Sequence, residues 1–124
     1  MKGTFMEFYT QSPEQTEANY RAILKRIRTQ TSARIVMLQP FLLDCEKNLH
    51  LRPGLNELLP IVKRLADEYA DLYIPLDELF NEAMKTQPEP CYYSADGVHP
   101  NDNGRAFIGK LYADAVKPII KELI

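Results

Sequence analysis

The stretch Arg34-Ile35-Val36-Met37-Leu38-Gln39 is short, almost wholly apolar and rich in branched side chains. Such a run is typical of a strand that is buried on both faces of a parallel sheet. Pro40 ends it. A second run, Leu72-Tyr73-Ile74-Pro75-Leu76, predicts another short strand. Because Pro75 has no N–H to donate to a sheet, we expect it at the end of that strand or on a sheet edge.

A helix is predicted before the first strand, at about residues 13–29. Apolar residues recur there at helical spacing. The start signal is strong, since Ser12 can cap the helix, Pro13 suits its first position and Gln15 can complete a capping box.

Further helices are predicted between and after the strands. The one between them carries an apolar stripe with Pro60 inside it, so the helix either begins near Glu57 or is kinked at Pro60. The last two are expected at residues 77–85 and from 101 or 102 to 122. The segment from Pro40 to Pro53 is expected to be a loop.

Strands that alternate with helices indicate an α/β domain in three layers, with a parallel sheet flanked by helices. We expect one domain over residues 1–124. Two strands are few for a self-sufficient sheet, and at least one would present an unpaired edge. The pattern therefore resembles the second half of a doubly wound fold.

Charge and hydropathy restrict the classes of partner. The net charge is -2, so no basic excess is present to neutralise phosphates and nucleic acid is not expected as a partner. The apolar runs are far shorter than the roughly 20 residues that span a bilayer, so no membrane segment is expected. The N-terminus has no signal-peptide pattern, and we expect a cytoplasmic protein.

The segment Asp96-Gly97-Val98-His99-Pro100-Asn101-Asp102-Asn103-Gly104 carries the candidate chemistry. A carboxylate and an imidazole three residues apart in a tight turn can face one cleft. The carboxylate then fixes the tautomer of the ring and stabilises the imidazolium that forms when the other nitrogen takes a proton. Ester or amide cleavage by a neutral hydroxyl needs such a base. The alternative interpretation is a helix-capping loop with a surface histidine.

The neighbours of this pair have their own predicted roles. Gly97 permits a turn that other residues resist. Asn101 or Asp102 can cap the helix that follows. Gly104 is unfavourable in a first helical turn, so close packing is its expected justification.

Asp-Gly-Val-His-Pro followed by Gly104 resembles the last conserved block of the SGNH/GDSL hydrolases, a family of serine esterases, lipases and acylhydrolases with a flavodoxin-like fold. Similarity to bacterial members extends from about residue 13 to the end of the chain. The resemblance implies that Asp96 orients the ring, that His99 is the general base, and that Gln39, Pro40 and Phe41 lie near the substrate cleft. It implies small esters or acetylated carbohydrates as substrates.

The chain also departs from the family. The Gly-Asp-Ser block that carries the nucleophile and the Gly-x-Asn-Asp block are not found in this sequence. The chain therefore corresponds to the C-terminal portion of such a domain, and we expect no nucleophile in it. Ser94 is the serine nearest to His99, and it is expected to form loop hydrogen bonds.

Cys45 and Cys91 are far apart, with no neighbours at metal-ligand spacing. They are expected to be two free or buried thiols, and a catalytic Cys91 is the weaker alternative. A metal site formed by Asp96, His99 and Asp102, with His50 as a further candidate, is disfavoured by ligand preference. No metal or cofactor is therefore expected.

Three functions follow from these patterns. The first is a carboxylic ester hydrolase to which this chain supplies Asp96 and His99. The second is a non-catalytic α/β fragment or interaction module that is stabilised by homo-oligomerisation through its open sheet edge. The third is an unrelated ligand-binding α/β domain in which Asp96 only caps a helix.

Overall fold

The computed structural model describes residues 11–43, 45–87, 89 and 91–123, and the chain divides into two compact units, residues 1–33 and 34–124. The described part of the first unit contains helix α2 (Pro13–Gln30), within one residue of the prediction. Ser12 caps it, because its Oγ accepts a hydrogen bond from the Gln15 N–H at 3.1 Å. The Gln15 side chain instead donates to Asn19, so the predicted capping box is only half formed.

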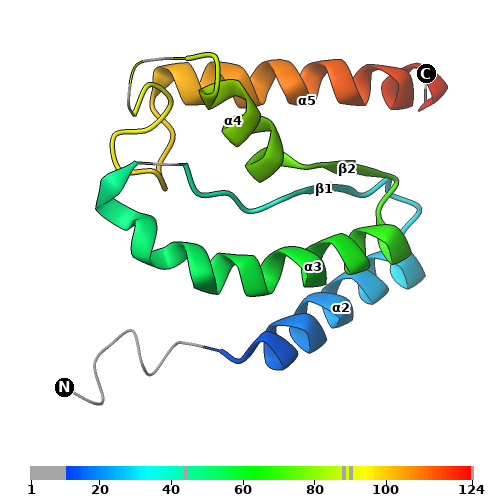
Figure 1. The fold of residues 1–124 in the computed structure, drawn as a ribbon. Helices are drawn as coiled ribbons and strands as arrows, with labels where there is room; N and C mark the ends of the chain where they lie inside the picture. Colours follow the sequence, from blue (N-terminus) through cyan, green and yellow to red (C-terminus); the bar gives the residue numbers. More distant parts are fainter. Residues whose placement is uncertain (1–10, 44, 88, 90, 124) are drawn as a thin grey trace. The chain divides into compact units, whose positions relative to one another are not determined.

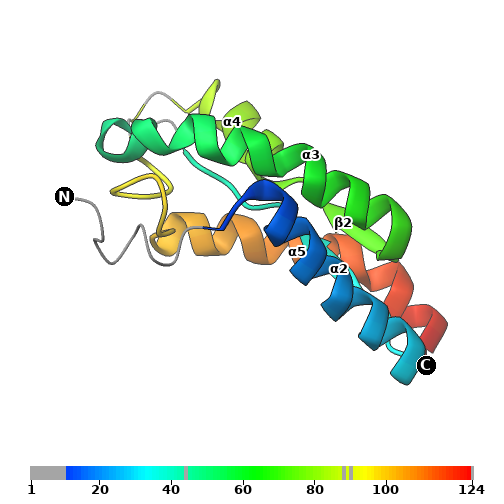
Figure 2. The same cartoon turned by 90° about the horizontal axis from the view of Figure 1, so that it is seen from below.

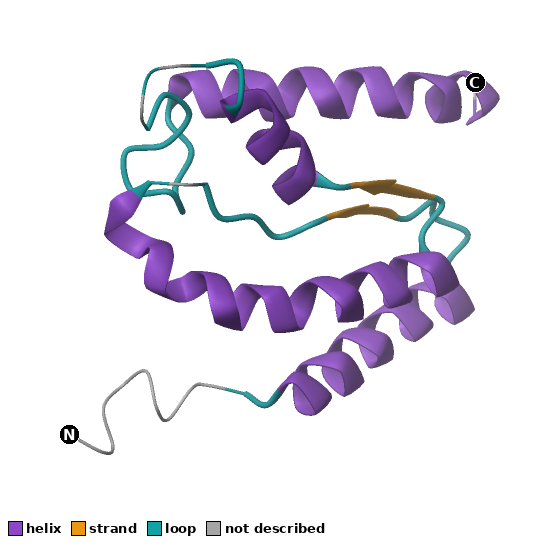
Figure 3. Cartoon of the chain, in the orientation of Figure 1, coloured by secondary structure: helices purple, strands orange, loops and turns teal. Residues whose placement is uncertain are grey.

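The second unit contains two parallel strands and the helices around them (Figures 1 and 3). Its elements are β1 (Val36–Leu38), the 3-10 helix η1 (Glu46–Leu51), α3 (Arg52–Tyr69), β2 (Leu72–Ile74), α4 (Leu76–Met84) and α5 (Asp102–Leu123). Val36 is opposite Leu72 and Leu38 is opposite Ile74. Pro75 directly follows β2, as predicted.

Helices cover both sides of the strands. Figures 1 and 2 show α3 on one side and α4 and α5 on the other. The cluster on the α5 side centres on Phe80 of α4, which is fully buried. Its ring lies 4.8 Å from that of Phe41, 5.4 Å from that of Tyr93 and 4.9 Å from that of Phe107. Aromatic packing therefore joins the loop after β1, α4, the loop before α5, and α5 itself.

The prediction of a loop from Pro40 to Pro53 was wrong, and of the two alternatives for the next helix the start near Glu57 was wrong. The expected loop contains η1, and α3 begins at Arg52 and not near Glu57. Pro53 explains the early start, because a first-turn proline lacks only an N–H that has no helical partner. The helix continues through Pro60.

The predicted fold class is confirmed: an α/β unit with a two-stranded parallel sheet between helices. None of the helices in the described residues combines the length and the apolar character needed to cross a bilayer. The expectation of one domain over residues 1–124 stays a prediction.

Candidate functional site

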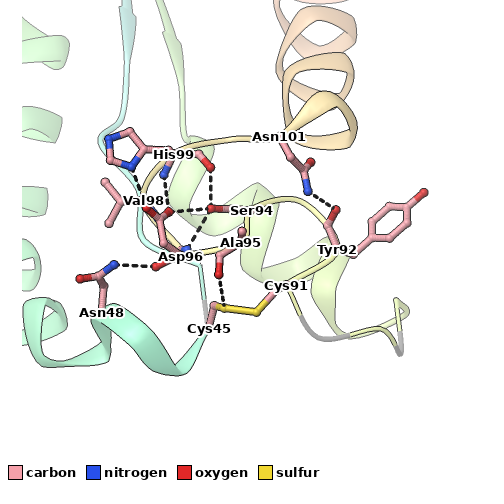
Figure 4. Close-up of a disulfide and its surroundings, with 11 residues drawn as sticks. Cys45, Asn48, Cys91, Tyr92, Ser94, Ala95, Asp96, Val98, His99 and Asn101 are labelled. Atoms are coloured by element: carbon pink, nitrogen blue, oxygen red, sulfur yellow. Dashed lines mark hydrogen bonds and ion pairs between the residues drawn. A yellow bond between two sulfur atoms is a disulfide. The ribbon is translucent and has the colours of Figure 1, made fainter.

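Asp96 and His99 contact each other in the loop between α4 and α5 (Figure 4). Asp96 Oδ2 lies 2.7 Å from Nδ1 of the His99 ring. This is the contact that the sequence predicted. It places the ring hydrogen on Nδ1 when the imidazole is neutral, which leaves Nε2 as the nitrogen that can accept a proton.

The other carboxylate oxygen is held by the backbone of the same turn. Asp96 Oδ1 accepts hydrogen bonds from the N–H of Val98 at 2.9 Å and from the N–H of His99 at 2.8 Å. The hydrogen bond from the His99 ring, assisted by these two N–H groups, holds the pKa of the Asp96 carboxyl well below its ordinary value. Asp96 is therefore ionised throughout the physiological range.

The pair lies at the surface. The His99 side chain is 84% exposed and the Asp96 side chain is 30% exposed. In the described part of the chain, the His99 ring is hydrogen-bonded to Asp96 alone. The accepting nitrogen is thus accessible to a group that approaches from outside the loop.

The segment after β1 holds the loop that carries Asp96 and His99 through two hydrogen bonds. The Leu43 N–H donates to the Gly97 carbonyl at 2.9 Å, and Asn48 Nδ2 donates to the Asp96 carbonyl at 2.8 Å. Gly97 has a φ of 85°, in the left-handed region, and a Cβ there would meet the Leu43 carbonyl oxygen at 2.8 Å. The predicted need for glycine at this turn is confirmed on both counts.

The start of α5 anchors the loop at its other end. Asn101 Oδ1 accepts from the Gly104 N–H at 3.0 Å, so Asn101 is the capping residue of the two that the sequence allowed. The predicted close packing at Gly104 is confirmed, because a Cβ there would overlap the backbone oxygen of Tyr93.

Cys45 and Cys91 form a disulfide, with their Cα atoms 5.5 Å apart (Figure 4). The expectation of two free or buried thiols was therefore wrong, and a catalytic thiol at Cys91 is excluded in this state. The bond links the segment after β1 to the start of the loop that carries Asp96 and His99. The two cysteines are 46 positions apart in the sequence, so only the fold brings them together.

Gln39 and Phe41 make contacts that support α4. The Gln39 side chain is 4% exposed, and its Oε1 accepts from the N–H groups of Asp77 at 2.9 Å and Glu78 at 3.4 Å. The Phe41 ring packs on that of Phe80. Pro40, which lies between Gln39 and Phe41 in the sequence, is half-buried. A place beside the substrate cleft stays a prediction for all three.

A partly buried ion pair that the sequence did not reveal fixes the same segment. Arg52 of α3 makes two hydrogen bonds to the Asp77 carboxylate, at 2.8 and 3.0 Å, and a third to the Leu42 carbonyl. Asp77 also accepts from the Leu42 N–H at 3.0 Å. The paired charges tie α3, α4 and the chain after β1 into one frame.

The other residues considered as a nucleophile or as metal ligands make no hydrogen bond to the His99 ring in the described part of the chain. The Ser94 hydroxyl is fully buried and contacts the His99 carbonyl, not the ring. His50 is exposed on η1. Within the described ranges, no group of three His, Cys, Asp or Glu side chains is placed to hold a metal ion. Asp102 therefore does not form such a group with Asp96 and His99.

Comparisons with known proteins identify the family that the chain matches. A model of the GDSL-like lipase/acylhydrolase family matches residues 7–107. An acetylxylan esterase of Geobacillus stearothermophilus is 23% identical over 99 residues, which cover 80% of this chain and 44% of the esterase. The chain thus spans about half the length of the relatives it matches.

Solved structures show the same fold. A protein named as a GDSL-like lipase from Parabacteroides merdae is 28% identical, with a TM-score of 0.79 over 90% of this chain and 53% of its own. Axe2, an acetylxylan esterase from Geobacillus stearothermophilus, is 22% identical, with a TM-score of 0.77 over 91% of this chain and 51% of its own. Two further Axe2 structures are of catalytic mutants, one with a serine and one with a histidine replaced by alanine.

Proposed function

Since this chain belongs to the GDSL-like lipase/acylhydrolase family, we propose that it supplies the acid–base half of a carboxylic ester hydrolase. His99 is the general base and Asp96 orients it. The nucleophilic serine and the oxyanion donors come from sequence outside this chain. The observation that carries the proposal is the 2.7 Å contact between Asp96 Oδ2 and His99 Nδ1, which leaves Nε2 open.

The geometry supports one sequence of proton transfers. Nε2 of His99 accepts the proton of the serine hydroxyl as the serine oxygen bonds to the ester carbonyl carbon. The ionised Asp96 stabilises the resulting imidazolium. His99 then donates that proton to the departing alkoxide, and an acyl-enzyme remains. A water molecule that loses a proton to Nε2 then attacks the acyl group, and His99 returns that proton to the serine oxygen as the acid departs, which restores the free serine and the neutral ring.

The substrates that we propose are acetyl esters of carbohydrates. Support comes from the relatives, because an acetylxylan esterase matches this chain both in sequence and in fold. Catalytic mutants of that esterase at a serine and at a histidine agree with a serine mechanism.

The test joins this chain to the half of the Geobacillus stearothermophilus acetylxylan esterase that it does not match. Acetate release from acetylated xylo-oligosaccharides is measured for this chimera and for the chain alone. We expect the chain alone to be inactive and the chimera to release acetate. The rate of the chimera should fall about 100-fold or more with His99→Ala, which is the scale of general base catalysis. His50→Ala is the matched control and should leave the rate unchanged. A folded chimera that is inactive, or indifferent to His99→Ala, contradicts the proposal.

Homo-oligomerisation through the sheet is the second candidate. In the described residues the sheet has only two strands, and Leu38 of β1 is 37% exposed. A short sheet with an open edge is a site for pairing with another chain. Light scattering of the purified chain tests this idea, and a monomer over the accessible concentration range would contradict it.

A further inference from the structure

Ser94 is a fully buried hydroxyl two residues before Asp96. A buried polar side chain is costly unless its hydrogen bonds are made. Loop hydrogen bonding was the expected role of Ser94, but the partners it has are specific. They belong to the residues of the acid–base pair and to the turn between them.

The hydroxyl makes three contacts (Figure 4). Its Oγ accepts from the Gly97 N–H at 2.9 Å. It lies 2.7 Å from the His99 carbonyl oxygen and 3.1 Å from Asp96 Oδ1, both of which accept hydrogen bonds. Because a hydroxyl has one hydrogen, that hydrogen is shared between the carbonyl and the carboxylate. One side chain therefore touches the backbone of the base and the carboxylate of its partner.

These contacts restrict the rotation of the carboxylate. Asp96 Oδ1 is held by two N–H groups and by Ser94, so Oδ2 is directed at the His99 ring. The carbonyl contact also fixes the backbone of His99. If the hydroxyl were removed, both parts of the pair would gain freedom at once.

We propose that Ser94 is a positioning residue for the Asp96–His99 pair: it acts through the carboxylate and the His99 backbone to keep the ring hydrogen on Nδ1. The positioning can be observed in the chain by itself. Its value for ester hydrolysis rests on the proposed function.

The experiment measures the tautomer of His99 in the isolated chain. Long-range ¹H–¹⁵N correlation spectra, recorded where the imidazole is neutral, give the ratio of the Nδ1–H to the Nε2–H form. We expect the Nδ1–H form to dominate in the natural protein. Ser94→Ala should lower the ratio at least about threefold, the scale of one hydrogen bond.

Asn48→Ala is the matched control. Asn48 supports the same loop through the Asp96 carbonyl, and the hydrogen bond that it makes involves neither the carboxylate nor the ring. It should leave the tautomer ratio unchanged, while backbone amide spectra show that both variants are folded. Equal shifts in the two variants, or no shift with Ser94→Ala, would overturn the proposal.

A measurement on the natural protein covers the case in which Ser94→Ala does not fold. The Ser94 hydroxyl proton should exchange slowly with water and show a nuclear Overhauser effect to the Gly97 amide. Rapid exchange would overturn the proposal. The esterase chimera gives an independent result: an inactive chimera with an intact tautomer preference refutes the proposed function alone. A chimera that depends on His99, with no effect of Ser94→Ala on the tautomer, refutes the positioning role alone.

Discussion

Loss of the Cys45–Cys91 disulfide should destabilise this chain by about 4 kcal/mol. The bond closes a loop with a sequence separation of 46. In the chain-entropy account, such a cross-link lowers the entropy of the unfolded chain by about 2.1 + 1.5R ln n cal/mol/K, which is about 13 cal/mol/K here and about 4 kcal/mol near 298 K. A small domain is stable by about 5–15 kcal/mol, so the loss would be a large fraction of the total.

Urea unfolding followed by circular dichroism, with and without a phosphine reductant, measures this effect. With a slope of about 2 kcal/mol/M, the midpoint should fall by about 2 M on reduction. The double variant Cys45→Ala/Cys91→Ala should unfold near the midpoint of the reduced protein and should not respond to the reductant. A shift below about 0.5 M in the natural protein, or two titratable thiols before reduction, would refute the reasoning.

Three further predictions concern the frame and the loop. Gly104→Ala should destabilise the chain by about 2 kcal/mol because its methyl overlaps backbone, whereas Gly109→Ala, with nothing within 4 Å, should stabilise the same helix by up to about 1 kcal/mol, both read from urea midpoints. Asp77→Ala should cost about 3 kcal/mol in the same assay, since it leaves Arg52 without its carboxylate. Because the folded-state pKa of Asp96 is depressed, its stabilisation is present above the unfolded value of 3.8 and is lost as the pH falls through the folded value. Urea midpoints of Asp96→Asn should therefore fall less steeply than those of the natural protein below about pH 4.

The features that could be predicted from the sequence are local ones. Ser12 and Pro13 mark the start of α2 because a cap and a first-turn proline act within one turn of chain. The contact of Asp96 with His99 was predictable for the same reason, since three residues in a tight turn set the reach of both side chains.

The features that were missed depend on the fold. The Cys45–Cys91 bond and the ion pair of Arg52 with Asp77 join residues 46 and 25 positions apart, and nothing in the flanking sequence specifies either partner. Ser94 carried a partial signal, because a serine two residues before the predicted acid can reach its carboxylate. Burial of its hydroxyl, which makes that contact structurally important, is a result of tertiary packing.

The disulfide also bears on where the protein works. Disulfides persist in oxidising compartments and are rare in the cytosol, where thiols are kept reduced. The bond between Cys45 and Cys91 therefore argues against the cytoplasmic location that we predicted from the sequence. That location stays an untested prediction. Alkylation of free thiols in freshly lysed cells, before any oxidation, would show which state the protein has where it is made.

The Asp96–His99 contact forms within this chain, but the strength of the attraction between the two groups depends on how exposed His99 is to water. Leu43 and Asn101, which hold the two ends of the loop, belong to this chain, as Asp96 does. The contact between Asp96 and His99 therefore forms without a contribution from the serine. The ring is nevertheless 84% exposed, and water weakens its attraction to the carboxylate. Two unit charges 4 Å apart interact by about 1 kcal/mol in water and by about 4 kcal/mol at the effective dielectric constant near a protein surface. A surface that brings the serine to Nε2 would also cover the ring and so strengthen the ion pair at the step where the imidazolium forms. Ser94→Ala should therefore change the tautomer of His99 in the isolated chain, while its full effect on hydrolysis should emerge only when that surface is present.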